Sequence, residues 1–252
     1  MVTFPLLRTR RLTIQLRELS IAEAAAVLAL PSHLEQAETT QILRYAVASV
    51  PQGEPDPAKW TLEERTMAIC HYLAITSPAG PDFEIGEGHF SDYLDGGNDR
   101  DASAPVPLGE AIGDNWSIRA LLGKHLESVE RLLGEVTDPR GNPLPARLHW
   151  LAGAMAASLL REGENVPGDD AADGELDAWM LDRIRTFVAL PEADFVTMLE
   201  VFTAGRERIA HLFRVGFQDT GAVFLPKEGA ALPPARFPCL SCISQSARYL
   251  CA

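Results

Sequence analysis

The feature that most constrains the fold is a series of segments in which apolar residues recur at helical spacing, each ended by proline or glycine. The clearest begins at Thr61, which forms a capping box with Glu64, and predicts a helix that ends near Thr76. Further segments with helical spacing predict helices over 21–30, 33–50, 115–136, 146–163, 176–190 and 191–213. Ser20, with Glu23 three residues on, predicts a capping box at the start of the first of these. This pattern predicts a mainly α protein, a helical bundle.

Only a few short β-strands are expected beside these helices. Apolar and polar residues alternate over 11–19, near the N-terminus, as in a half-buried strand, and residues 215–226 favour one short hairpin. Segment 77–110 concentrates glycine, proline and aspartate, which predicts a long irregular loop with aromatic anchors. The proline-rich approach to the C-terminus predicts an irregular tail, because proline cannot continue a helix or a central strand.

These elements divide the chain into consecutive regions that we expect to form one compact body. The 252 residues are enough for a substantial hydrophobic core. The expected regions are a strand with a helical hairpin (1–50), a capped helix with the aromatic and acidic loop (51–113), the helical bundle (114–214), and a hairpin with a cysteine-rich extension (215–252).

Charge and hydropathy exclude some classes of partner. The net charge of −13 disfavours nucleic acid, because an acidic surface repels phosphate groups. No apolar run reaches the length of about 20 residues that a membrane span needs. The N-terminal segment lacks the pattern of a secretory signal. We therefore expect a protein made in the cytoplasm, where persistent disulfides are rare.

The cysteines are the strongest candidates for a binding site. Three of the four, Cys239, Cys242 and Cys251, lie in the final fourteen positions, whereas Cys70 lies far upstream in the capped helix. Its place beside the apolar stripe of that helix predicts that Cys70 is buried or half-buried. Two intervening residues let Cys239 and Cys242 direct both sulfurs at one ion. Cys251 and Cys70 complete a set of four ligands for zinc or a [4Fe-4S] cluster.

Other interpretations of these cysteines stay open. Cys70 can be an ordinary buried residue and the tail cysteines free thiols. His71 competes as the fourth ligand, although adjacent residues on a helix point about 100° apart. A redox disulfide between Cys239 and Cys242 is the least favoured alternative, because the strand and helix that flank such a motif in thioredoxins are missing.

Catalytic motifs are missing from the sequence. It contains no G-x-S-x-G, P-loop, H-E-x-x-H or G-x-G-x-x-G after a strand. The histidines are scattered singly, as surface or packed residues are. An acidic run over 169–177 has the composition of a calcium loop but not its ligand spacing. We therefore expect no enzymatic activity.

Three segments, "LTIQLRELSIAEAAAVLALP", "WTLEERTMAICHYLAIT" and "DFEIGEGHFSDYLDG", resemble tail-tip and baseplate hub proteins of long-tailed bacteriophages. Some proteins of this class carry an iron-sulfur cluster near the C-terminus, and the resemblance implies Cys239, Cys242 and Cys251 as its ligands, with Cys70 added from the cysteine count alone.

The resemblance implies a structural subunit of a phage tail tip or baseplate hub. Its partners would be other tail or baseplate proteins in a larger assembly, and its final location the virion tail. Two alternatives stay open, a small iron-sulfur or redox enzyme and a tail assembly chaperone that is absent from the mature particle.

Overall fold

The architecture is a mixture of helices and small sheets, not the predicted helical bundle. The computed structural model describes residues 2–168, 170–237 and 239–251, and of Cys251 the backbone only. Within these residues it contains nine α-helices (44% helix) and four small antiparallel sheets (19% strand). The prediction of a mainly α fold with few strands was therefore wrong.

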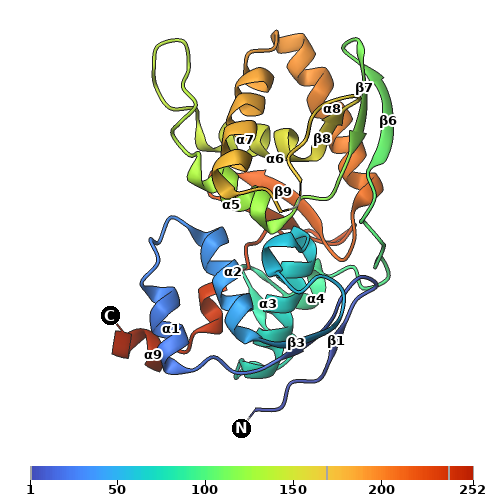
Figure 1. Cartoon of the computed structure of the whole chain (residues 1–252). Coiled ribbons are helices and arrows are strands. Elements are labelled where there is room, and N and C mark those ends of the chain that lie inside the picture. Colours follow the sequence, from blue (N-terminus) through green and yellow to red (C-terminus); the bar gives the residue numbers. More distant parts are fainter. Residues whose placement is uncertain (1, 169, 238, 252) are drawn as a thin grey trace.

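The first part of the chain forms the lower part of the molecule in Figure 1. Its main sheet has the order β1-β2-β3, and a second sheet is the hairpin β4-β5. The elements are β1 (Leu7–Arg8), β2 (Thr13–Leu16), α1 (Ile21–Leu28), α2 (Glu35–Ala46), β3 (Val47–Gln52), the 3-10 helix η1 (Pro57–Lys59), α3 (Leu62–Thr76), β4 (Glu84–Ile85), β5 (Gly88–His89) and α4 (Phe90–Tyr93).

The middle of the chain forms the upper part, where helices lie beside a sheet of order β6-β7-β8, and a β9-β10 hairpin follows (Figure 1). These elements are β6 (Val106–Ala111), β7 (Asp114–Ile118), α5 (Gly123–Arg131), α6 (Ala146–Ser158), β8 (Leu159–Arg161), α7 (Asp173–Val188), α8 (Glu192–Ile209), β9 (Arg214–Gln218) and β10 (Gly221–Leu225). The tail contains the 3-10 helix η2 (Cys239–Cys242) and α9 (Gln245–Cys251).

Local signals in the sequence placed several boundaries correctly. Ser20 and Thr61 both form the predicted capping boxes, with Glu23 and Glu64 respectively. The helix from Thr61 spans the predicted range, and β2 alternates between buried and half-buried residues as expected. The predicted hairpin over 215–226 is β9 and β10.

Strand pairing explains why three predicted helices were too long. Residues after Ala46 form β3, in which Val47 pairs with Leu16 of β2. Residues 115–118, predicted as the start of a helix, belong to β7, and β8 follows α6 directly so that Leu159 pairs with Ile118. Short apolar runs fit both a helix and a strand, and here a distant partner strand decided between them.

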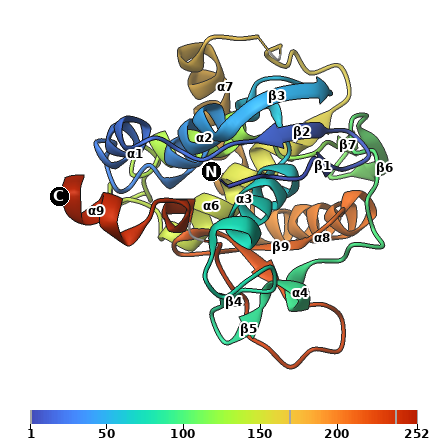
Figure 2. The same cartoon turned by 90° about the horizontal axis from the view of Figure 1, so that it is seen from below.

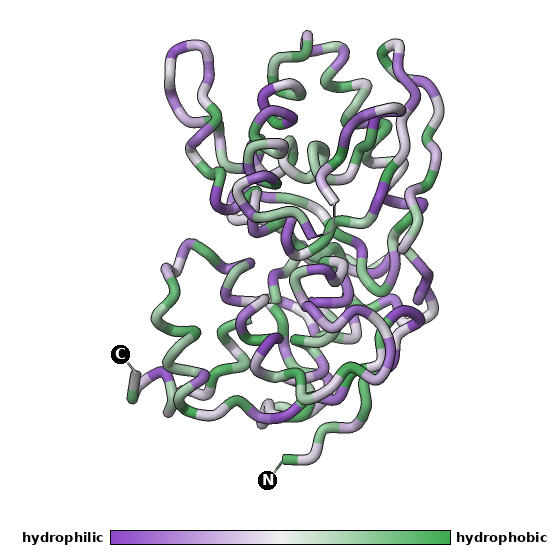
Figure 3. The backbone as a smooth tube through the Cα atoms, in the orientation of Figure 1, coloured by the Kyte–Doolittle hydropathy of each residue, from purple (hydrophilic) through white to green (hydrophobic). Residues whose placement is uncertain are grey.

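One hydrophobic core connects the two parts of the molecule. The same cluster of buried residues includes Trp60 in the first part and Leu121 and Met155 in the second. Polar and apolar residues are mixed along the visible backbone (Figure 3). Among the described residues, no helix combines the length and apolarity that crossing a membrane requires.

Candidate functional site

The C-terminal tail returns to the first part of the chain and is ordered there. Helix η2 packs against α2 and α3, and α9 packs against α1, as the view in Figure 2 also shows. The prediction of an irregular tail was therefore wrong. One sequence signal for α9 was missed, namely Ser244 directly before the helix. Its Oγ accepts a hydrogen bond from the Ala247 N–H at 3.1 Å, as the side chain of an N-cap residue does.

Aromatic packing holds the segment that leads into the tail. The ring of Phe237 lies 4.8 Å from that of Phe224 and 5.6 Å from that of Phe213, both with tilted or edge-on geometry. Tyr93 contacts Phe237 at 6.1 Å. Such aromatic contacts stabilise the fold by more than the apolar area that they bury. The segment that leads into the tail is therefore tightly packed against the rest of the molecule.

Three of the four predicted ligands lie in one buried region. Cys70 on α3, Cys239 and Cys242 are 0%, 2% and 6% exposed, belong to the same core cluster, and are free thiols. Cys70 is thus buried, as its place on the helix predicts. The side chain of Cys251, the fourth predicted ligand, lies outside the described residues.

Burial keeps these thiols protonated. It raises the pKa of Cys70 and of Cys242 well above the ordinary value, and the neighbouring thiols of Cys242 and Cys239, respectively, raise them further. Burial also raises the pKa of Cys239 to about 12. A metal ion binds the thiolate, so binding here would release protons.

The described residues do not form a complete metal site by themselves. No group of three or more histidine, cysteine, aspartate or glutamate side chains within them is arranged to hold a metal ion. His71, the competing fourth ligand, places Nε2 2.9 Å from the carbonyl oxygen of Pro5. The donors present suit zinc or an iron-sulfur cluster, and the set of four requires Cys251.

A group of carboxylates lies beside Cys239. The Sγ atom of Cys239 lies 3.8 Å from the carbonyl oxygen of Glu35 and 4.0 Å from Glu38 Oε2, so the thiol can donate a hydrogen bond to either oxygen. Arg236 forms an ion pair with Glu35. Burial, followed by the charge of Glu35, raises the pKa of Glu38 to about 7. Arg236 and Cys239 therefore lie against the first turn of α2, which contains these two glutamates.

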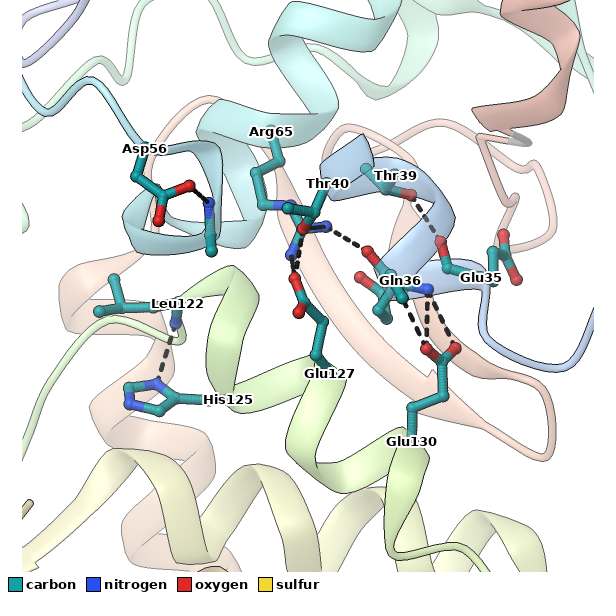
Figure 4. Close-up of polar contacts among 12 residues, drawn as sticks. Glu35, Gln36, Thr39, Thr40, Asp56, Arg65, Leu122, His125, Glu127 and Glu130 are labelled. Atoms are coloured by element: carbon teal, nitrogen blue, oxygen red, sulfur yellow. Dashed lines mark hydrogen bonds and ion pairs between the residues drawn. The ribbon is translucent and has the colours of Figure 1, made fainter. Parts of the chain in front are cut away.

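The N-terminus of α2 is capped by a residue from another helix. Glu130 of α5 accepts hydrogen bonds from the N–H groups of Gln36 at 3.0 Å and Ala37 at 3.3 Å, whereas Leu34 at the N-cap provides no side-chain bond (Figure 4). Burial raises the pKa of Glu130 to about 7, although these amide bonds oppose the shift. This cap joins the two parts of the molecule.

Arg65 is the charged centre of this network. Its Nη2 donates to the carbonyl oxygen of Gln36 at 2.7 Å and to Thr40 Oγ1 at 2.9 Å, and Nη1 lies 3.9 Å from Glu127 (Figure 4). Burial lowers the pKa of the Arg65 guanidinium, which nevertheless stays charged because arginine retains its proton in proteins. Nε and Nη1 have no hydrogen-bond partner among the described residues.

A small cavity adjoins Arg65 and Cys239. Its volume is about 30 Å³, and its wall also includes Glu35 and Thr39. This space suffices for one or two water molecules of about 10–15 Å³ each on the same scale. Sequence reasoning missed the network, although one signal was present, since Arg65 interrupts the apolar stripe between Leu62 and Ile69.

Comparison with known proteins brings no match. No protein-family model matches the chain, and neither a curated protein nor a solved structure is significantly similar to it.

Proposed function

We propose that this protein is a structural subunit of a bacteriophage tail tip or baseplate hub, with its C-terminal tail fastened to the body by a metal ion or an iron-sulfur cluster. The ligands would be Cys70, Cys239, Cys242 and Cys251. One observation carries the proposal, namely that the tail folds back so that η2, which carries the buried Cys239 and Cys242, packs against α3, which carries the buried Cys70.

A structural role agrees with the burial of the thiols. Closed sites with four cysteine ligands stabilise folds, whereas catalytic sites keep a coordination position open. Zinc or a cluster, when bound, would supply a crosslink between the tail and α3. The residues of this chain hold the thiols protonated until then, and the packing of Phe237 positions the tail. A fixed tail of this kind offers neighbouring subunits a defined surface.

Anaerobic purification with elemental analysis and an absorption spectrum tests the bound metal. We expect about one zinc or about four iron atoms per chain, the latter with visible absorbance. The variant Cys70→Ala should lose the metal, and a protease should cleave residues 239–251 faster. The core variant Ile69→Val serves as the matched control on α3, and should keep both the metal and the protected tail.

Protein that contains no zinc or iron after anaerobic purification would contradict the fastening role. So would metal-free protein whose tail resists proteolysis as well as that of the metal-bound protein. Reversible bleaching with turnover of an electron acceptor would instead favour the redox enzyme. Mass spectrometry of purified phage particles tests the assembly role separately. A structural subunit is present in the particle, whereas an assembly chaperone is found only in the infected cell.

A further inference from the structure

A large groove lies where the tail meets the first part of the chain. It has a volume of about 830 Å³ and is bounded by α1, the end of α3, β4 and the tail. These elements come together on the face shown in Figure 2. Its apolar wall includes residues from each of them, namely Ile21, Leu73, Phe83, Ile85, Ile243 and Ala247.

The apolar surface continues outside the groove. Ile21 is 54% exposed, and α9, which contributes Ala247 to the wall, also exposes Tyr249 (86%) and Leu250 (72%). Large apolar side chains gathered beside a hollow mark a surface for another macromolecule. Most polar residues of the wall, such as Ser20 and Ser244, are exposed or half-buried, and the hydroxyl of the buried Tyr72 already accepts a hydrogen bond from the Leu19 N–H, whereas small-ligand sites direct a few buried polar groups at the ligand.

The walls determine which kind of segment fits. Among the described residues, helices and connecting loops share the wall, and the strand in it, β4, has only two residues, so the groove offers no long strand edge that an extended segment could pair with. Its apolar side chains instead suit recognition of the kind in which an amphipathic helix lies in a groove.

The charges of the groove and of the whole chain disfavour a second copy of this chain as the occupant of the groove. Glu18 and Glu84 are exposed in the groove lining, against one exposed cation, Arg248. The whole chain carries a net charge of −13, so two copies repel each other. A partner with basic residues beside its apolar stripe complements both the groove and the overall charge.

We infer that the groove binds an amphipathic helical segment of a neighbouring protein, with apolar residues on one face and lysine or arginine along its border. This inference rests on the proposed assembly function, because it names the contact through which the subunit joins its neighbours. The tail then has a second role, since it supplies one wall of the binding surface.

The test uses the full-length protein and a fluorescein-labelled synthetic helix of leucine and lysine at amphipathic spacing. Fluorescence anisotropy at physiological salt measures its Kd, beside a peptide with glutamate in place of lysine. The lysine peptide should bind, and the double variant Glu18→Lys, Glu84→Lys should weaken binding about tenfold. Ile21→Ser should weaken it as well.

The matched control is Glu110→Lys, Glu200→Lys, which makes the same change in net charge at exposed positions of β6 and α8. Its Kd should stay within about twofold of the parent value. Equal weakening in both double variants, or equal binding of the acidic peptide, would overturn the inference. So would a dimer in sedimentation that Ile21→Ser dissociates. None of these measurements reads metal content or the composition of phage particles, so the proposed function is judged by separate experiments.

Discussion

At the scale of single residues, the buried Arg65 depends on the absence of a side chain at Gly123. A Cβ at this first residue of α5 would lie 2.1 Å from Arg65 Nη1 and 2.7 Å from its Cζ. The guanidinium cannot withdraw easily, because Nη2 bonds to Gln36 and Thr40. This glycine therefore provides the space that a charged side chain occupies inside the core.

We predict that Gly123→Ala lowers the free energy of unfolding by about 1–3 kcal/mol, the usual cost of overpacking a core. Urea denaturation at neutral pH measures it. Gly174→Ala is the control, since this glycine also lies in the first turn of a helix, α7, and a Cβ there meets nothing within 4 Å. It should leave stability unchanged or raise it slightly, because alanine favours helix. Equal losses in both variants would contradict the packing argument.

Cys70 and Arg65 show which residues of a site can be predicted from the sequence and which cannot. Cys70 was predicted buried from its position on a helix, and it is. Arg65 was missed, because a charged residue on an apolar stripe is stable there only if distant groups bond to it. Those groups, such as the carbonyl oxygen of Gln36, become neighbours only in the folded chain.

At the scale of elements, the helix caps divide into local and tertiary ones. Ser20, Thr61 and Ser244 cap their own helices from positions visible in the sequence. The cap of α2 is Glu130, 94 residues from Gln36 along the chain, and no spacing rule connects the two. Local caps can be predicted from sequence, whereas this one required the packing of α5 against α2.

We predict that Ser244→Ala frays α9, because it removes the acceptor for the Ala247 N–H. The expected loss is about 1 kcal/mol of local stability, as for other N-cap serines. Hydrogen exchange of residues 245–250, followed by mass spectrometry, measures it. Ser246→Ala, at an exposed position within the same helix, is the control and should leave exchange unchanged. Equal protection in Ser244→Ala and the parent protein would show that packing against α1 alone holds the helix.

At the scale of the whole molecule, the buried glutamates make stability depend on pH. Glu38 and Glu130 each have a folded-state pKa of about 7, above the ordinary 4.5. The folded state therefore binds their protons more tightly than the unfolded chain does. Their contribution to stability is complete below about pH 4.5 and is lost as the pH rises through about 7.

We predict that the buried glutamates lower the free energy of unfolding between about pH 5 and pH 8, opposed by His125 and His149, whose pKa burial lowers, and that Glu38→Gln makes the change with pH less negative. Urea denaturation at several pH values measures it. Glu23→Gln is the control. The ion pair with Arg17 lowers the Glu23 pKa to about 2, so its contribution disappears only as the pH falls below about 4.5. The same slope in Glu38→Gln and the parent protein would contradict the prediction.

Features that depend on neighbours along the chain could be predicted from the amino-acid sequence alone. These are the capping boxes at Ser20 and Thr61, the extent of α3, the alternation of β2 and the grouping of cysteines near the C-terminus. Backbone bonds within a few residues set such features, so their signals are local.

Long-range contacts were needed to distinguish helix from strand at β3, β7 and β8, because a strand is stable only beside a partner that the sequence does not name. Such contacts also place α9 against α1 and η2, with Cys239 and Cys242, against α3, and they make Glu130 the cap of α2. Each of these features depends on burial and bonding between residues far apart in the chain. Such contacts stabilise the protein only once the whole chain has folded.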